Sequence, residues 1–418
     1  MKSRVHISLA LCTVLVAAAT AGAVEITVTN SAELTSAIHS LTPGTTVLIE
    51  PGTYDGGNFL DQAQGTASDP IIIRGSDPDN PPVFSGGGVV AMLISSAEYL
   101  TLSDLRIEGY SGNGLNIDHG GSFATPSHHI TLNNLAILDT GPTGNHDGLK
   151  MSGVNDFVVR RCHFEGWGGS GIDIGACTNG VVEDCTFIGK DGFSQWRGIN
   201  AKGGSENVLI QTSYFLNAGA RAVEIGGSTD LIYFPPGGCD FEARHITVGG
   251  NRIVGSDAPV AWVTADGGRV HHNTMVLPEA WAARILQESS NPQFLPCHDG
   301  RFEHNLIVFD DQLSSYSAVN VGTGTAPETF VFHHNAWYDL TGGGRDPVLR
   351  DLPPETDGVY DADPELIDFG LPTMRIGSSD PQFDNIGADA YVRPVPEPGV
   401  GVLLSLGGLL ARFLRGRR

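Results

Sequence analysis

A short pattern recurs nine times between residues 103 and 337, and it constrains the fold more than any other feature of the chain. The first copy reads SDLRI (103–107) and the last reads HHNAW (333–337). The central positions are Leu105, Leu135, Cys162, Cys185, Ser213, Asn251, Asn273, Asn305 and Asn335, and neighbouring copies lie 22 to 38 residues apart. Helical repeats do not tolerate such uneven spacing. Stacked coils of short strands do, because the loops between the strands can differ in length.

A second pattern alternates apolar and polar residues within each repeat, as in GLKMS (148–152) and GIDIG (171–175). This period of two is typical of a strand with one buried face. The two patterns predict an all-β, single-stranded right-handed parallel β-helix, in which successive coils stack ~4.8 Å apart. Equivalent positions of successive coils then lie directly above one another. The asparagines at 251, 273, 305 and 335 should therefore form a ladder of side-chain amides.

Both ends of such a solenoid need a cap. The amphipathic stretch 32–40 predicts an N-terminal capping helix. The stretch 341–391 is rich in Asp, Gly and Pro, which predicts irregular structure over the C-terminal end followed by a linker. We therefore expect the β-helix domain to span residues 24–392.

The first 23 residues have the features of a secretory signal peptide. Lys2 and Arg4 precede an apolar run over 7–19, and the small residues AGA (21–23) follow it. A basic start, a short apolar core and a small-residue cleavage site define such a peptide. We therefore expect an exported protein.

The segment 393–418 contains VPEP (395–398), an apolar run over 399–411 and four arginines after residue 411. These three parts in this order resemble the PEP-CTERM sorting signal of Gram-negative bacteria. The resemblance implies recognition by an exosortase and cleavage of the tail; a plain C-terminal anchor is the alternative. Either implies an extracellular or cell-surface location, with membrane contact only through this segment.

The formal net charge of −23 argues against nucleic acid as a partner. Apart from Lys2, Arg4 and the four arginines after residue 411, the chain has 18 Lys and Arg, and half of them fall between Lys150 and Arg252. Gathered bases in an acidic chain indicate a local site for anions. We expect the protein to be a monomer.

The outward positions of the second strand predict where this site lies. Stacked in register, they form a column of Asn116, Lys150, Asp173, Asn200, Glu224, Trp262 and Asn320, with Lys202 two positions further along its strand. Loops add His146, Asp147, Trp196, Arg197, Arg221 and Arg244. Exposed tryptophans suit stacking on sugar rings. The charges could instead serve only to keep the face soluble, pairing across rungs.

The cysteines predict one disulfide. Cys239 and Cys297 lie in long loop insertions, and an oxidising compartment favours a bond between them. Cys162 and Cys185 occupy one column in adjacent repeats and are expected to be a buried pair of small side chains, with a strained disulfide between them as the alternative.

Three N-terminal motifs, PGTTVLIEPGTY (43–54), GTASDPIIIR (65–74) and PVFSG (82–86), resemble the chondroitinase B and alginate lyase family (polysaccharide lyase family 6), within the pectate-lyase-like group. The resemblance implies β-elimination on a uronate polysaccharide, with a lysine base and an assisting arginine. INAK (199–202) resembles the strand that carries this lysine, so Lys202 is the implied base. Gly226 stands where the family has its arginine, so Arg221 or Arg197 would have to replace it. DGLK (147–150) is similar to the lysine strand of family-nine pectate lyases, which makes Lys150 a second candidate.

Three functions remain open on these residues. The first is a lysine-dependent lyase, whose base needs its pKa lowered by neighbouring cations; Asp173 and Glu224 would then bind calcium or balance the charge. The second is an inverting glycoside hydrolase with Asp173 and Glu224 as the carboxylate pair, two rungs or roughly 9–10 Å apart. The third is a non-catalytic surface or matrix protein that binds carbohydrate or is structural.

Overall fold

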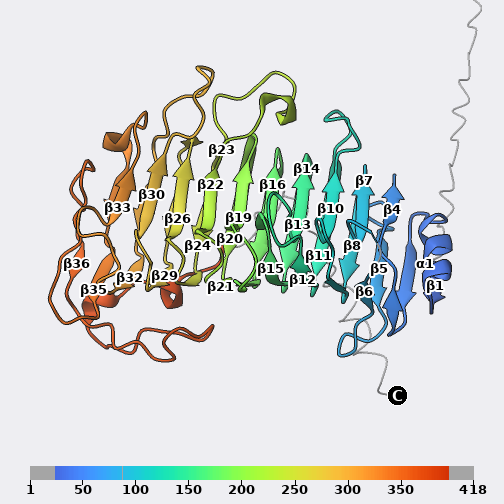
Figure 1. Cartoon of the computed structure of the whole chain (residues 1–418), viewed down its shortest axis with the longest axis horizontal. Coiled ribbons are helices and arrows are strands. Elements are labelled where there is room, and N and C mark those ends of the chain that lie inside the picture. Colours follow the sequence, from blue (N-terminus) through green and yellow to red (C-terminus); the bar gives the residue numbers. More distant parts are fainter. Residues whose placement is uncertain (1–23, 87, 395–418) are drawn as a thin grey trace, which may run out of the picture.

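The computed structural model describes residues 24–86 and 88–394. The predicted signal peptide and all but the first two residues of the predicted sorting segment lie outside these ranges. Within them, three long parallel sheets wind around a common axis (Figure 1). The predicted right-handed parallel β-helix is confirmed. No helix among the described residues has the length and apolar character needed to cross a bilayer.

Most coils contribute one strand to each sheet. Sheet A contains β1 (Val24–Val28), β2 (Thr45–Ile49), β5 (Ile71–Gly75), β8 (Glu98–Ser103), β11 (Ser127–Asn133), β14 (Val154–Arg160), β17 (Thr178–Glu183), β20 (Ser205–Gln211), β23 (Ala243–Arg244), β24 (Thr247–Gly249), β27 (Ala265–Asp266), β28 (Arg269–His271), β31 (Arg301–Glu303) and β34 (Val331–His333). Sheet B contains β3 (Thr53–Tyr54), β6 (Val83–Ser85), β9 (Arg106–Glu108), β12 (Ala136–Thr140), β15 (His163–Trp167), β18 (Thr186–Ile188), β21 (Tyr214–Leu216), β25 (Arg252–Val254), β29 (Thr274–Val276), β32 (Leu306–Phe309), β35 (Ala336–Asp339) and β36 (Val359–Tyr360). Sheet C contains β4 (Asn58–Asp61), β7 (Met92–Ser95), β10 (Leu115–Asp118), β13 (Leu149–Ser152), β16 (Ser170–Gly175), β19 (Arg197–Lys202), β22 (Arg221–Gly226), β26 (Ala258–Val263), β30 (Ala283–Leu286) and β33 (Val319–Val321).

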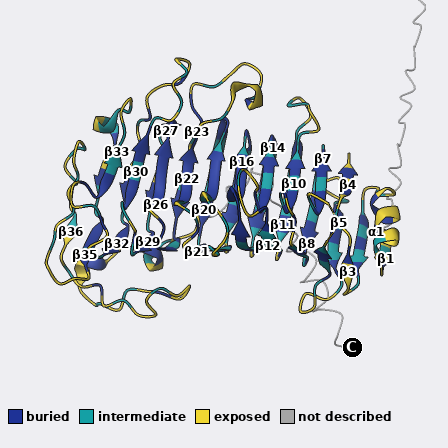
Figure 2. Cartoon of the chain, viewed as in Figure 1, coloured by how far each residue is buried: buried dark blue, intermediate teal, exposed yellow. Residues whose placement is uncertain are grey.

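The core runs the length of the solenoid as columns of like side chains. In sheet C, Leu149, Ile172 and Ile199 pair in register and are fully buried. In sheet B, the rings of Phe164, Phe187 and Phe215 stack at centroid distances of 4.9 and 4.7 Å. Figure 2 shows the strands as buried, whereas most exposed residues lie in the loops and the capping helix. Burial along these columns is the main source of stability in such a fold.

The asparagine ladder forms as predicted. Each Nδ2 donates at 3.0 Å to the Oδ1 of the next asparagine, from Asn251 through Asn273 and Asn305 to Asn335. The last amide donates to Glu355, which closes the ladder. All four asparagines are fully buried, so every amide depends on its neighbours for hydrogen bonds.

Asn305→Ala should destabilise the protein by about 2–5 kcal/mol. The substitution removes the acceptor of two Asn273 donors and the donor to the Val270 carbonyl, and each orphaned buried group costs about 1–3 kcal/mol. A lowered urea midpoint would report the loss. Asn80→Ala, in an exposed turn, should leave the midpoint unchanged; equal midpoints for the two variants would contradict a stabilising ladder.

The N-terminal cap is α1 (Ser31–Ile38), close to the predicted span 32–40. Asn30 caps the helix by accepting a hydrogen bond from the Glu33 amide, as is typical of an N-cap. Leu34 and Ile38 are buried against the first coil, so the cap excludes water from the open end of the core.

The C-terminal region differs from the prediction of a wrapped end followed by a linker. Glu355 accepts from the Trp337 indole at the end of the core, but the segment 361–394, here called the strap, turns back along the outside of the helix (Figure 1). Met374 and Ile386 of the strap are buried against sheet B. Arg252 donates to the Met374 carbonyl, and Arg393 forms an ion pair with Asp184. The strap is therefore part of the packed fold.

The disulfide predicted between Cys239 and Cys297 is not formed. Cys297 is buried among backbone groups at the junction of two coils, while Cys239 remains in its loop near Gly204. Both cysteines lie in loops between strands, as predicted, and only their pairing was wrong: Cys297 is fully buried, whereas Cys239 is partly buried. Cys162 and Cys185 are buried free thiols, as predicted.

A stack of histidines lies beside the ladder, beneath the strap. The rings of His272 and His304 stack at 4.8 Å, and His271 packs against Tyr391. Burial, with nearby Arg269 and His272, lowers the pKa of His271 to about 3. Burial, with His272 and His334, lowers the pKa of His304 to about 4.

These histidines should make the protein less stable as the pH falls from about 6.5 toward 4. The folded state holds them neutral, whereas the unfolded chain takes up protons below a pKa of about 6.5, so acid favours unfolding. A melting-temperature series across this window should fall for the unaltered protein. The dependence of melting temperature on pH should be flatter for the double variant His271→Gln, His304→Asn, because two of the groups that titrate are removed. Asparagine is chosen at 304 because it suits the positive φ there. Parallel slopes for both proteins would contradict this origin.

Candidate functional site

The outer face of sheet C brings most of the predicted site residues together. Strand register places Asn116, Lys150, Asp173, Asn200 and Glu224 in one outward column, as expected. The column forms because each strand alternates inward aliphatic and outward polar residues. Lys202 lies on the same face beside Asp173, and Arg197 and Arg221 begin β19 and β22.

Asp173 is the centre of one group of charges. Its Oδ2 lies 2.9 Å from Lys150 Nζ, and its Oδ1 lies 3.1 Å from Lys202 Nζ. Lys150 also contacts Asp147 Oδ2 at 3.1 Å. Asp147 is fixed from behind, because its Oδ1 accepts from the Ser170 amide at 2.8 Å. Two lysines are thus held over two buried carboxylates.

Glu224 is the centre of a second group, one rung beyond Asn200. It is fully buried and pairs with both Arg197 and Arg221. Asn200 Nδ2 donates to Glu224 Oε1 at 3.3 Å. Arg221 also reaches Glu288 at 2.6 Å, at the edge of the face. These two groups of charges are called the sheet C cluster.

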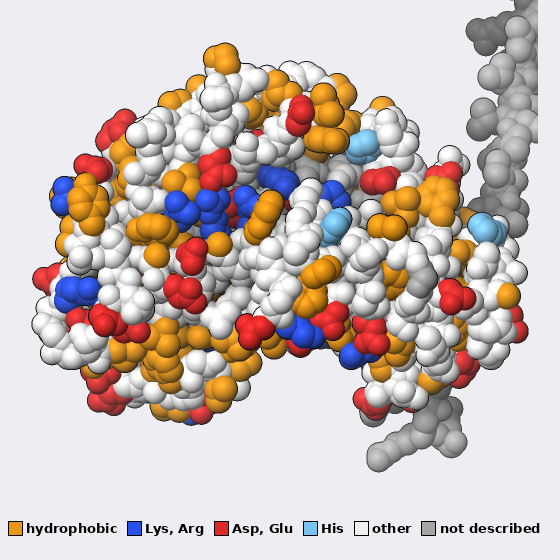
Figure 3. Space-filling view, in the orientation of Figure 1, with side chains coloured by type: hydrophobic (Ala, Val, Ile, Leu, Met, Phe, Trp, Pro, Cys, Tyr) orange, Lys and Arg blue, Asp and Glu red, His pale blue; other side chains and the backbone are white. Residues whose placement is uncertain are grey.

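The sheet C cluster is layered, with carboxylates below and cations above. Asp147 and Glu224 are fully buried, whereas the side chains of Lys150 and Lys202 are 30% and 21% exposed. Figure 3 shows Lys and Arg side chains gathered in a hollow at the middle of this face. A ligand that approaches the hollow therefore meets cationic groups first.

Burial and charge set the protonation states in the first group. Burial alone would lower the pKa of Lys150, but Asp173 and Asp147 outweigh it and raise that pKa, so Lys150 stays protonated. Burial opposes ionisation of Asp173, but Lys202 and Lys150 together lower its pKa below the usual range. Burial and the neighbouring Asp173 raise the pKa of Asp147.

Asp173 and Glu224 act in the structure as counter-ions for the cations. Each already faces two cationic side chains, so a calcium ion at either would displace an existing ion pair. Of the two roles expected for these carboxylates, balancing the charge of the face is the one that the geometry supports.

Trp262 was predicted to face outward and does not. It pairs in register with the inward Ile225, it is fully buried, and Ala261 takes the outward position beside Glu224. Every residue of β26 is buried, so the strand has no polar alternation from which to read its facing. Trp196 remains available at the edge of the cluster, with 49% of its surface exposed.

Two further predicted residues make no contact within the sheet C cluster among the ion pairs of the described residues. Arg244 belongs to β23 in sheet A, where it pairs with Glu206 and stacks on Phe241. His146 is exposed in the loop before β13, next to Asp147. Arg244 was misplaced because its coil carries a long insertion, which obscures where the next sheet begins.

Sequence reasoning missed Arg284, on β30. The register Ala261, Arg284, Asn320 puts it on the same outward column as Glu224 and the lysines. The signal is the alternation in AARIL (282–286), which lies inside a 32-residue interval between repeats. Glu288, the second partner of Arg221, was missed for the same reason.

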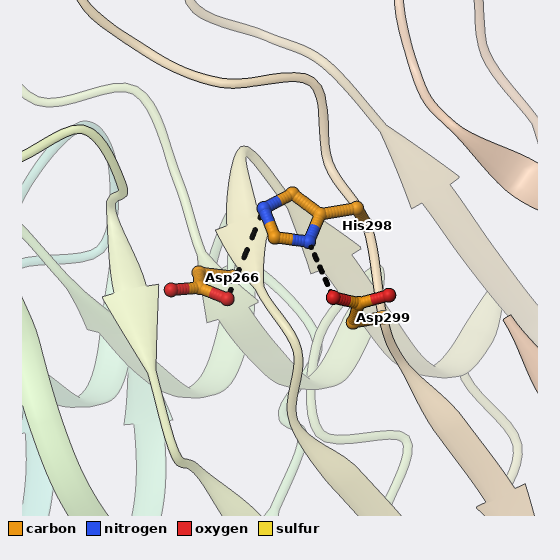
Figure 4. A group of neighbouring side chains, drawn as sticks. All are labelled: Asp266, His298 and Asp299. Atoms are coloured by element: carbon orange, nitrogen blue, oxygen red, sulfur yellow. Dashed lines mark hydrogen bonds and ion pairs between the residues drawn. The ribbon is translucent and has the colours of Figure 1, made fainter. Parts of the chain in front are cut away.

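A separate group consists of Asp266 in β27 and of His298 and Asp299 just before β31, where two neighbouring coils enter sheet A (Figure 4). Nε2 of His298 faces Asp266 at 3.8 Å, and Nδ1 faces Asp299 at 3.0 Å. One ligand atom from each of the three residues lies within 4.8 Å of the others, but the two carboxylates face different nitrogens of the imidazole. Arg244 stacks on the previous rung, 3.8 Å from Asp266. The group suits a ladder of alternating charge better than a metal site.

Comparisons with known proteins agree with the fold. A family model described as "Right handed beta helix region" matches residues 88–275. No curated protein is detectably similar. The A-module of a mannuronan C-5 epimerase from Azotobacter vinelandii is similar in structure, with a TM-score of 0.55 and 14% identity over 80% of this chain and 94% of that one.

Two other solved structures have a TM-score of 0.50. One is a mannuronic acid specific family 6 polysaccharide lyase from human gut microbiota, 14% identical over 77% of this chain and 88% of that one. The other is a lacto-N-biosidase from Eubacterium ramulus, 17% identical over 81% of this chain and 67% of that one. At these identities the likeness concerns the fold. The chain is a right-handed parallel β-helix protein with a cluster of ion-paired charges on the outer face of one sheet.

Proposed function

We propose that this protein is an exported polysaccharide lyase that acts on a uronate-containing polysaccharide bound across the outer face of sheet C. The observation that carries the proposal is the layered cluster, in which partly exposed lysines and arginines stand over buried carboxylates in a chain of net charge −23. Such a surface attracts a polyanion while the rest of the protein repels it. Two similar structures belong to enzymes named for mannuronan or mannuronic acid, which supports this substrate class.

Lys202 is the proposed base. Its amine would remove the proton on the carbon next to the uronate carboxylate, and the electron pair of that C–H bond would form a carbon–carbon double bond. The bond to the glycosidic oxygen then breaks, the leaving oxygen takes up a proton from water, and the protonated Lys202 returns its proton to the solvent. Lys150 is the weaker candidate, because two carboxylates keep it protonated, whereas Lys202 pairs with one.

Arg197 and Arg221 are the proposed electrophilic groups. Negative charge grows on the uronate carboxylate as its neighbouring proton leaves, and fixed cations stabilise that charge. Glu224 holds both guanidinium groups in place from below, so they need not reorganise during the reaction. In this proposal they replace the assisting arginine of polysaccharide lyase family 6, whose position is occupied by Gly226 in this chain.

The hydrolase alternative is less well supported. An inverting hydrolase needs one carboxylic acid that can donate a proton and one free carboxylate that can activate water. Asp173 and Glu224 are both buried, and both are paired with two cations. Non-catalytic binding remains the closer competitor, since the same cations would hold an acidic polysaccharide without turnover.

The test is to incubate the protein with polymannuronate, polyguluronate, chondroitin and pectate. A rise in ultraviolet absorbance from an unsaturated product on one of them is the expected result. Three outcomes would each overturn the lyase: reducing sugar without that absorbance, epimerised sugar without chain cleavage, or retention of the polymer without any chemical change. They would indicate a hydrolase, an epimerase and a binding protein respectively.

A further inference from the structure

Arg284 differs from the other cations on sheet C because it has no carboxylate partner. Lys150, Lys202, Arg197 and Arg221 each form at least one ion pair. Within residues 24–86 and 88–394, no carboxylate oxygen lies within ion-pair distance of Arg284. The only side-chain hydrogen bond that Arg284 makes to the described residues is from Nε to Asn320 Oδ1, at 3.0 Å.

Neighbouring side chains hold the guanidinium of Arg284 in place, but most of its N–H groups have no hydrogen-bond acceptor among the described residues. It lies over the Trp281 ring, 4.6 Å from the centroid, and Asn320 orients its Nε. The four N–H groups on its two terminal nitrogens have no partner among the described residues. This fork has the geometry that binds a carboxylate or a sulfate in a bidentate manner.

Holding this cation half-buried and unpaired is unfavourable. Burial and the nearby Arg221 lower the pKa of Arg284, and Glu288, Asp257 and Glu224, which lie beyond ion-pair distance, offset this only in part. A partly buried cation without a counter-ion is unfavourable, and an anion delivered by a ligand would remove that penalty. A purely structural role would be served better by an uncharged side chain at this position.

Arg284 lies on the same outward column of sheet C as the proposed reaction centre. It shares the outward column with Glu224, and only the methyl group of Ala261 lies between them. Two rung spacings separate Arg284 from Glu224, roughly 10 Å along the helix axis. A sugar chain that follows the column would therefore meet Arg284 beyond the unit held by Arg197 and Arg221.

We propose that Arg284, supported by Asn320 and Trp281, is a second anion-binding subsite, which binds the acidic group of a sugar unit beyond the reacting one. The inference rests on the proposed function for the direction of the chain, and it adds a requirement on substrate length. The ligand is a carboxylate of a uronate or a sulfate ester, since both present paired oxygens to a guanidinium.

Arg284→Gln tests the subsite by calorimetric binding of uronate oligosaccharides of two to six units. The affinity for the longest oligomer should fall about 10- to 100-fold, the size expected for a charge-assisted bidentate contact. The disaccharide affinity should be unchanged. Arg301→Gln, which alters a paired arginine on sheet A, is the matched control and should leave both affinities unchanged. Repeating the series with a sulfated neutral oligosaccharide separates the two kinds of acidic group.

Melting temperature gives a second readout that requires no turnover. Without ligand, Arg284→Gln should melt at the same temperature as the unaltered protein or higher, because an unpaired cation is removed. Long oligouronate should raise the melting temperature of the unaltered protein more than that of the variant. Equal affinity losses for the short and long oligomers, or none for either, would overturn the subsite. Length-dependent binding without product would uphold it while refuting the lyase.

Discussion

Lys202→Met should reduce the release of unsaturated product by about 100- to 10,000-fold, the usual contribution of a general base. The variant keeps the length and apolar stem of the side chain and removes only the amine. Asp173 keeps its ion pair with Lys150, so the fold should survive. Initial rates of absorbance increase on the substrate identified above are the measurement, with melting temperature as a check on folding.

Two other lysines make this prediction specific. Lys190→Met is the matched control, because Lys190 pairs with Asp139 outside the sheet C cluster, and it should leave the rate unchanged. Lys150→Met should lower the melting temperature as well as the rate, since Asp147 and Asp173 would lose the cation they share. If Lys202→Met keeps its full rate while Lys150→Met loses it, the base has been assigned to the wrong lysine.

The solenoid could be predicted because the same residue pattern recurs from coil to coil. Nine copies of one pattern, the ladder from Asn251 to Asn335 and the alternation around Lys150 and Asp173 all describe the same coil. Where a strand is apolar on both faces, as β26 is, the alternation disappears and the facing of Trp262 cannot be read. Parallel strands buried on both sides are commonly uniform in this way.

The strap could not be predicted for a different reason. Its contacts are single long-range bonds, such as that from Tyr214 to the Gly370 carbonyl, and nothing periodic marks them. The same holds for Cys297, whose coil position depends on how the insertion before it closes. Local composition indicates irregular structure in both cases, but it does not show what the irregular segment packs against.

For the candidate site, the sequence predicted most of the residues that lie on the face, but not which carboxylate pairs with which cation. The column that joins Lys150, Asp173, Asn200 and Glu224 follows from register alone. Which carboxylate supports which cation depends on rotamers and on residues such as Asp147, whose burial comes from the loop before its strand. The layered arrangement, with acids below and bases above, is therefore visible only in three dimensions.

Because of this layering, the charge of Glu224 should raise the stability of the fold and lower the affinity of the face for a polyanion. Its carboxylate is fully buried and balances Arg197 and Arg221, so it stabilises the fold by satisfying two partly buried cations. The same negative charge weakens the pull of the face on a polyanion. A residue whose only role is to stabilise the fold would not link these two quantities in opposite directions.

Glu224→Gln should therefore lower the free energy of unfolding by about 3–5 kcal/mol, the cost of breaking a buried ion pair, while increasing the affinity of the face for an acidic polysaccharide. The amide keeps the shape of the side chain but leaves Arg197 without its counter-ion. Urea denaturation and binding of polyuronate at low salt are the two measurements. Glu288→Gln, which removes the less buried partner of Arg221, should cost less than about 1 kcal/mol. If both variants lose the same stability, or if Glu224→Gln binds the polymer more weakly, Glu224 does not hold the cations from below, and the layered cluster would no longer account for recognition of a polyanion.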